Sequence, residues 1–176
     1  MKSFKNHYNR RKTLPILQNS SFENPLLLTN SYTYYNVLNQ SQKDSLVWIC
    51  GGNDTEKSAG PSLVNGISGW NILNPFSDGN QCIALQSTSF IQQSIFFKSG
   101  TYNFSVSYIS RSSNNNNQIN ILIDDVIIGT FGNFPVNVWT IFSQQFTISN
   151  NSVVVLKLIG LSIGDVTTAI DNITIT

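Results

Sequence analysis

The stretch that decides the fold is TTAIDNITIT, residues Thr167 to Thr176. Apolar and polar side chains alternate along it and most are β-branched, a pattern typical of a β-strand. Asp171 is the one charged residue in the stretch. We predict that this strand closes a β-sandwich by pairing with the beginning of the globular body, Asn19 to Pro25.

Working outward from this strand, the rest of the chain also has the pattern of short strands. Tyr102, Phe104, Val106 and Tyr108 alternate with polar residues, and Asp124-Asp125 precedes Val126 to Phe131 as a hairpin turn would. Helix signals are nearly absent. Turns every eight to twelve residues predict an all-β fold, an antiparallel β-sandwich of the jelly-roll type. Further strands are expected at Ile16–Leu17, Tyr32–Tyr35, Leu46–Ile49 and Trp70–Leu73.

The composition favours the same fold class. Charged residues make up 11% of the 176 residues, while about one residue in eight is Asn. Uncharged polar side chains suit strand faces and turns better than helices. The length is enough for one domain with a good core. We therefore expect a β-sandwich domain over residues 14–176, preceded by an arm of residues 1–13.

The arm is strongly basic, although the net charge of the chain is only +1. Half of the ten basic residues lie within it, which gives it a charge of about +5 and leaves about −4 on the body. Such an arm could tether the protein to an acidic partner, a nucleic acid or a membrane surface. The alternative is a solvated N-terminus without a partner. The five residues are Lys2, Lys5, Arg10, Arg11 and Lys12.

Two further features bear on the location of the protein. The sequence shows neither an apolar run of signal-peptide length after its basic start nor a stretch long enough to span a bilayer. Cys50 and Cys82 are too few for a disulfide framework, so we expect two free, half-buried thiols. We expect an assembly at a virion or cell surface, reached without a classical secretion signal.

A set of short motifs resembles the galactose-binding-like jelly rolls of carbohydrate-binding modules in bacterial surface and secreted proteins. The resemblance covers about residues 16 to 176 and implies the same fold, which serves many functions. The motifs include Asn19-x-Ser-Phe-Glu-x-Pro, Trp48 with Gly51-Gly52, Asp78-Gly79-Asn80-Gln81, Gly100-Thr101-Tyr102 and Ala169-Ile170-Asp171-Asn172.

The resemblance also implies a metal site. In these modules an acid in the Phe-Glu motif and an acid in the last strand hold a structural Ca²⁺ together with backbone carbonyls. Glu23 and Asp171 match those positions, and carboxylate and carbonyl oxygens are the ligands that Ca²⁺ prefers. The alternative is that both acids hold turns by hydrogen bonds, without a metal.

Two residues are candidates for ligand binding. Arg111, the one arginine outside the arm, ends a strand whose polar face carries Thr101 to Ser107, where it could bind a sugar hydroxyl or carboxylate. The alternative is an ion pair or a bond to loop carbonyls. Trp48, beside the Gly51-Gly52 loop, is the tryptophan that we expect to be exposed and able to stack on a sugar ring. At least two of the three tryptophans should be core.

The sequence offers no catalytic constellation. Asp124 and Asp125 are adjacent, and adjacent residues of a strand point to opposite faces, so the two carboxylates could not easily act on one substrate bond. A hairpin turn explains them better. The single histidine, His7, lies in the arm. We therefore predict a non-catalytic structural component, built on a carbohydrate-binding-like jelly roll and fixed into a virion shell or surface layer by its arm. The alternative function is a module that binds surface glycans.

Overall fold

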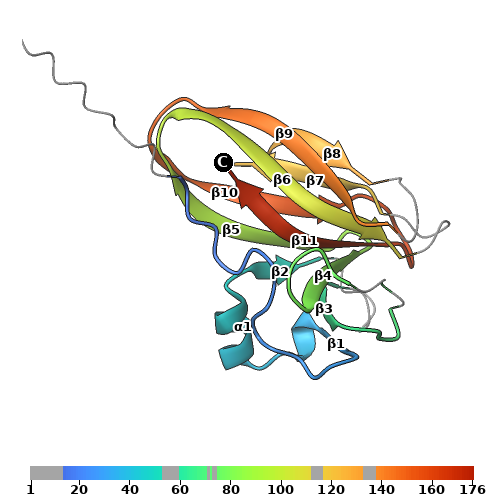
Figure 1. Cartoon of the computed structure of the whole chain (residues 1–176). Helices are drawn as coiled ribbons and strands as arrows, with labels where there is room; N and C mark the ends of the chain where they lie inside the picture. The colour runs from blue at the N-terminus through green and yellow to red at the C-terminus, as the bar shows by residue number, and fades with distance from the viewer. Residues whose placement is uncertain (1–13, 53–59, 71, 73–74, 112–116, 133–137) are drawn as a thin grey trace, which may run out of the picture.

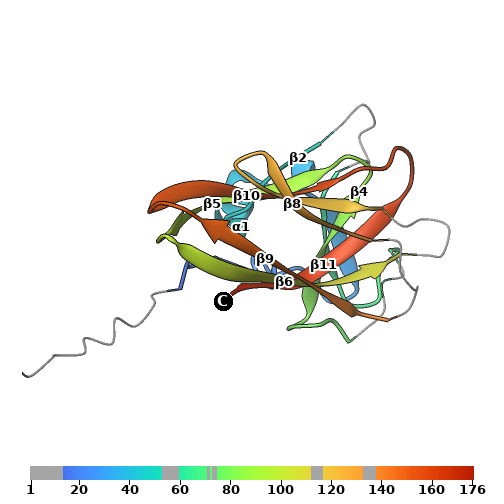
Figure 2. The same cartoon turned by 90° about the horizontal axis from the view of Figure 1, so that it is seen from above.

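The computed structural model describes residues 14–52, 60–70, 72, 75–111, 117–132 and 138–176. The predicted arm and its five basic residues lie outside these ranges. Two antiparallel β-sheets face each other, as Figure 1 shows from the side and Figure 2 from above. The all-β jelly-roll fold predicted from the sequence is confirmed.

The six-stranded sheet has the strand order β1-β3-β4-β11-β6-β9, and the five-stranded sheet has the order β2-β5-β10-β7-β8. The strands are β1 (Ser31–Tyr34), β2 (Ile49–Gly51), β3 (Ser62–Asn65), β4 (Gln81–Gln86), β5 (Phe90–Phe97), β6 (Gly100–Ser110), β7 (Ile119–Ile123), β8 (Val126–Phe131), β9 (Thr140–Ile148), β10 (Ser152–Gly160) and β11 (Thr167–Ile175).

The closing strand β11 lies inside the six-stranded sheet, between β4 and β6. Its register shifts between Asp171 and Thr174, at a bulge where Asn172 has a φ of 48°. The predicted pairing with Asn19 to Pro25 is wrong: β11 pairs with β4 over Thr167–Ile170 and with β6 on its other edge, and residues 19–25 form no strand. One backbone hydrogen bond remains, from the Ile173 amide to the Ser20 carbonyl at 3.0 Å.

Two apolar clusters hold the fold together. The larger one fills the space between the sheets and includes Phe22, Trp48, Phe104 and Leu156. The smaller one gathers Trp70 and Phe76 from the β3–β4 connection with Cys82 of β4 and Ala169 of β11. Because side chains alternate across a strand, this second cluster lies on the other face of the six-stranded sheet. The β3–β4 connection therefore covers part of that outer face.

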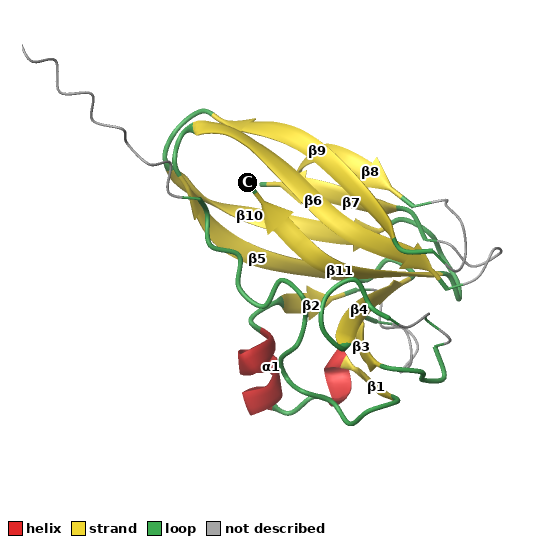
Figure 3. Ribbon diagram, in the orientation of Figure 1, coloured by secondary structure: helices red, strands yellow, loops and turns green. Residues whose placement is uncertain are grey.

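One helix departs from the prediction. Figure 3 shows α1 (Gln40–Leu46) below β2, at the end of the molecule that also carries β1 and β3, and the short 3₁₀ turn η1 (Tyr35–Val37) beside β1. A capping box starts α1: the Asn39 side chain accepts from the Gln42 amide, and the Gln42 side chain accepts from the Asn39 amide, each at 3.0 Å. Leu46 is its one buried residue, so the helix has no apolar periodicity to detect.

Several predicted strands are also misplaced. Residues Ile16 and Leu17 are not in a strand, Leu46 ends α1, and Trp70 and Ile72 lie in the β3–β4 connection. Residues 71 and 73 lie outside the described residues. The apolar character of these segments reflects burial against the sheets rather than strand pairing.

The hairpin prediction is confirmed. Asp124 and Asp125 both have positive φ, 46° and 63°, between β7 and β8. The thiols of Cys50 and Cys82 are free as expected, but both are buried rather than half-buried.

Candidate functional site

A pocket of about 340 Å³ lies at the end of the six-stranded sheet where Arg111 follows β6. Its walls come from the edge strand β1, the β3–β4 connection, the ends of β4 and β6, and the β10–β11 connection. The side chains of β1 and β4 that line it belong to the outer face of the sheet. The lining residues are Tyr32, Tyr34, Gly69, Trp70, Gln86, Arg111 and Asp165.

Three aromatic rings form one wall of this pocket. Tyr32 and Tyr34 alternate along β1 and therefore project from the same face. Tyr32 meets Trp70 edge-to-face with ring centroids 6.0 Å apart, and Tyr34 meets Trp70 at 6.2 Å. Trp70 is only 4% exposed, whereas Tyr32 is 44% exposed. Tyr32 is thus the ring that a ligand can reach.

Arg111 connects this aromatic wall to a carboxylate. Its guanidinium carbon lies 5.0 Å from the centre of the Trp70 ring, within the range of a cation–π contact. Nη1 donates to Asp165 Oδ1 at 3.1 Å. The predicted strand-end ion pair of Arg111 is therefore present, and it lies inside a pocket. In the described part of the chain the guanidinium has no other hydrogen-bond acceptor, and it carries five N–H donors.

The polar side of the pocket is neutral overall. Asp165 Oδ1 also accepts from Gln86 Nε2 at 2.7 Å, which holds the carboxylate beside the guanidinium. Burial, followed by the nearby Tyr32, raises the pKa of Tyr34, so its hydroxyl stays protonated and able to donate. The pocket thus presents N–H and O–H donors and carboxylate acceptors next to an accessible ring.

The expected exposure of Trp48 is wrong. Trp48 is 1% exposed and belongs to the core between the sheets. Its Nε1 donates to the Asn19 carbonyl at 3.0 Å, and its ring lies 5.7 Å from that of Phe22. It follows a left-handed residue, Val47, which ends α1 and turns the indole inward. With Trp70 also buried, the prediction that at least two tryptophans are core is confirmed.

Glu23 and Asp171 both hold the segment that leads into β4. Glu23 Oε1 accepts from the amides of Asn80 at 2.9 Å and Gln81 at 2.8 Å. Asp171 Oδ2 accepts from the Asp78 amide at 2.7 Å, and its Oδ1 accepts from the Asn172 amide. A Cβ at Gly79, which has a φ of +67°, would collide with the Glu23 carboxylate. The two acids therefore clasp the Asp78–Gln81 segment.

The clasp agrees with the hydrogen-bonding alternative to a metal site. Among the residues that the structure describes, no three His, Cys, Asp or Glu side chains come together in a way that could hold a metal ion. Three carboxylate oxygens of the pair already accept backbone N–H groups, and Glu23 Oε2 accepts none from the described residues. Calcium binding at Glu23 and Asp171 stays a prediction.

Four residues of the pocket escaped sequence reasoning: Tyr32, Tyr34, Gln86 and Asp165. The alternation Tyr32-x-Tyr34 was the available signal, because it places two rings on one strand face. Asp165 gave none, since it lies in a loop far along the chain from both tyrosines.

In the described part of the chain, no helix is long and apolar enough to cross a membrane.

Comparison by sequence gives no relatives: no family model and no curated protein matches the chain. Solved structures do match. The stig cyclase Fisc from Fischerella sp. TAU, in complex with an indole compound, has a TM-score of 0.70 at 13% identity and covers 94% of this chain and 97% of its own.

Two carbohydrate-binding modules match less closely. A family 35 module from Clostridium thermocellum has a TM-score of 0.51 at 12% identity, covering 82% of this chain and 97% of its own. The xylan-binding CBM22-1 domain of Paenibacillus barcinonensis Xyn10C also scores 0.51, at 11% identity, covering 74% of this chain and 85% of its own.

These likenesses show the fold. The chain has the jelly-roll fold of carbohydrate-binding modules, as the sequence motifs implied. The same fold is also found in cyclases, which are enzymes. That this protein is not an enzyme therefore stays a prediction, and its function has to be argued from the site.

Proposed function

We propose that this protein is a carbohydrate-binding module and that the pocket around Arg111 holds the sugar. The observation that carries the proposal is the meeting of an exposed tyrosine ring with an arginine–carboxylate pair inside one concave site. The carbohydrate-binding modules among the similar structures support it. It corresponds to the alternative function predicted from the sequence.

The chemistry of the pocket suits a sugar. A pyranose has an apolar face of axial hydrogens, which stacks on an aromatic ring such as Tyr32. Its neighbouring hydroxyls both donate and accept, so one can accept from Arg111 while the next donates to Asp165. The ion pair is partly exposed, with 28% of the Arg111 side chain and 66% of the Asp165 side chain accessible. Such a pair adds at most about 1 kcal/mol to stability, so it is available for recognition.

A glycan array of the wild-type protein and three variants tests the proposal. Tyr32→Ala and Arg111→Ala should abolish or greatly weaken every glycan signal. Lys157→Ala is the matched control, since Lys157 Nζ lies 4.6 Å from the Phe90 ring, a cation–π pair outside the pocket. Its signals should equal those of the wild type. Signals that survive in Arg111→Ala and Tyr32→Ala would move the glycan site elsewhere, and an array without signals would contradict the proposal.

The structural role in a virion shell or surface layer is a further proposal for the whole chain. It depends on the charge of residues 1–13, which lie outside the described residues. A binding module and an assembly arm are compatible, because they use different parts of the protein. The comparisons support the glycan-binding module and say nothing of the assembly.

A further inference from the structure

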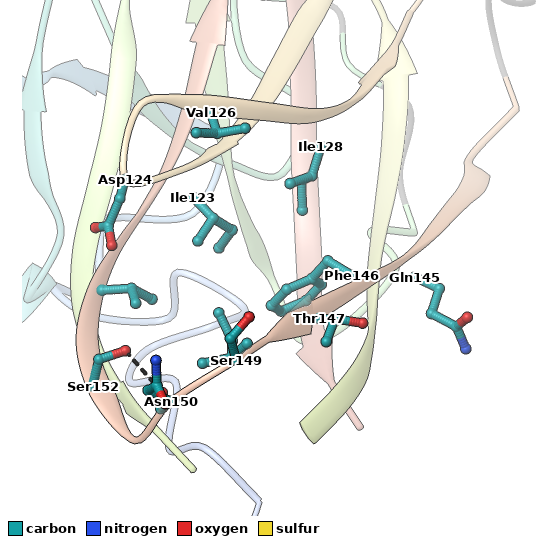
Figure 4. A pocket seen from close by; sticks show the side chains of 12 residues that line it. Ile123, Asp124, Val126, Ile128, Gln145, Phe146, Thr147, Ser149, Asn150 and Ser152 are labelled. Atoms are coloured by element: carbon teal, nitrogen blue, oxygen red, sulfur yellow. Dashed lines mark hydrogen bonds between the residues drawn. The ribbon is translucent and has the colours of Figure 1, made fainter. Parts of the chain in front are cut away.

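A second and larger pocket opens between the two sheets. Its volume is about 640 Å³, within the range of small-molecule sites. It lies at the end of the sandwich that carries the β7–β8 turn and the β9–β10 turn (Figure 4). None of its lining residues belongs to the pocket around Arg111.

The pocket exists because two sheet edges meet there without pairing. β8 is an edge of the five-stranded sheet and β9 is an edge of the six-stranded sheet. Core side chains beneath these edges stay within reach of solvent: Phe146 is 7% and Ile148 is 8% exposed, whereas Leu156 at the centre of the core is fully buried. Figure 4 shows Ile123, Ile128 and Phe146 pointing toward one another around the hollow.

The rim differs from the walls. It carries hydroxyls and amides, with Ser149 and Asn150 on the β9–β10 turn and Ser152 at the start of β10. Asp124 is the one charged side chain among the lining residues. Its Oδ1 accepts from the Val155 amide at 2.8 Å and its own amide donates to the Val155 carbonyl at 3.0 Å, so the residue is held in place. The second carboxylate oxygen accepts no hydrogen bond from the described residues.

We propose that this pocket binds a small aryl-alkyl amine. An aromatic ring would lie among Ile123, Ile128 and Phe146, where apolar burial and edge-to-face contact with Phe146 favour it. The ammonium group would lie at the rim against Asp124. A sugar fits poorly, because these walls offer its hydroxyls no partners. An apolar anion would face the Asp124 carboxylate. This site is independent of the glycan proposal.

The test uses three probes of one shape and different charge: 2-phenylethylamine, 2-phenylethanol and phenylacetate. Calorimetry and ligand-observed NMR at pH 7 should rank their affinities in that order. Asp124→Asn should weaken binding of the amine roughly threefold to fivefold and leave the alcohol unchanged. Asparagine suits this position, because it tolerates the φ of 46° and keeps an oxygen for the Val155 amide.

Two further variants complete the design. Asp125→Asn is the matched control, in the same turn with a φ of 63° but outside the lining, and it should bind the amine almost as well as the wild type. Ile128→Trp should fill the hollow and abolish binding of all three probes, with an unchanged melting curve and an unchanged glycan array. The proposal is overturned if the folded wild type binds none of the probes, or if Asp124→Asn binds amine and acid as the wild type does.

Discussion

Trp48 and Arg111 show how the role of a residue depends on what surrounds it. Both were candidate ligand contacts, yet Trp48 is enclosed in the core while Arg111 lines a pocket. Trp48 comes directly after the left-handed end of α1 at Val47, and its side chain lies in the core between the sheets. Because α1 has no apolar periodicity, the burial of Trp48 could not be predicted from the local sequence.

Trp48→Ala should therefore damage the fold rather than a binding site. Replacing a buried tryptophan by alanine costs about 3–5 kcal/mol, from lost apolar burial and the cavity left behind. The free energy of unfolding, measured in urea, should fall by that amount. Trp48→Phe should lose much less, mainly the hydrogen bond to the Asn19 carbonyl at about 1 kcal/mol. A stable Trp48→Ala protein that has lost only glycan binding would contradict the core assignment.

The buried Asp171 should make the stability of the fold depend on pH in an unusual way. Burial raises its pKa to about 7, and the nearby Asp78 and Glu23 charges add to this, while hydrogen bonds from the Asp78 and Asn172 amides partly offset the shift. An unfolded Asp titrates near pH 3.9, so between about pH 4 and pH 7 the folded state holds a proton that the unfolded state releases. Stability therefore falls as pH rises through this window.

Melting curves of the wild type and of Asp171→Asn from pH 4.5 to pH 8 measure this effect. Each unit of pKa shift corresponds to about 1.4 kcal/mol, so Asp171 contributes a few kcal/mol across the window. The wild type should lose stability more steeply with rising pH than the variant does. Equal slopes for the two proteins would show that the Asp171 carboxyl ionises normally in the fold.

The calcium prediction concerns the segment Asp78–Gln81, which Glu23 and Asp171 hold in place. A bound Ca²⁺ would favour the ionised form of Asp171, and Glu23 and Asp171 are the two acids that would supply it with carboxylate oxygens. Added Ca²⁺ should then raise the melting temperature at pH 8, where protons do not compete, and raise it less at pH 5. A chelator should reverse the gain, and Glu23→Gln should remove it. Identical melting curves in Ca²⁺ and in chelator at pH 8 would leave the clasp as hydrogen bonding alone.

The elements also show which local signals suffice. The Asp124-Asp125 turn was predictable, because aspartate tolerates positive φ and apolar alternation flanks it. β6 was predictable from its period of two. Trp70 and Ile72 misled, because their apolar side chains cover the outer face of a sheet from a connection. An apolar run indicates that a segment is buried. Whether the segment also pairs as a β-strand depends on its partner strand.

At the scale of the whole molecule, the fold class was predictable and the site was not. Alternation and turn spacing are repeated along the chain, so the jelly-roll fold is predicted correctly even where single strands are misplaced. The pocket joins Tyr32, Trp70, Arg111 and Asp165 from four separate segments. No local sequence pattern predicts that these four residues come together. Of the four, Arg111 was predicted as a ligand contact, because it is the one arginine of the body.

Deleting residues 1–13 tests the division into arm and body. Residues 14–176 contain all the described strands and both apolar clusters, so the truncated protein should melt at the temperature of the full chain. It should lose the basic charge of about +5 and elute from heparin at lower salt. In the native source it should no longer copurify with the assembly. Normal incorporation of the truncated protein would argue against the tethering role.

The place of β11 has a consequence for how the protein is made. This strand comes after all the other described strands, yet it lies in the middle of the six-stranded sheet between β4 and β6. During synthesis both neighbours emerge first and must wait with unpaired edges, which are prone to join other chains. Completion of the sheet is thus postponed until residue 175 has left the ribosome. A stalled or prematurely terminated product would expose two open edges, a hazard for aggregation in any cell that expresses it.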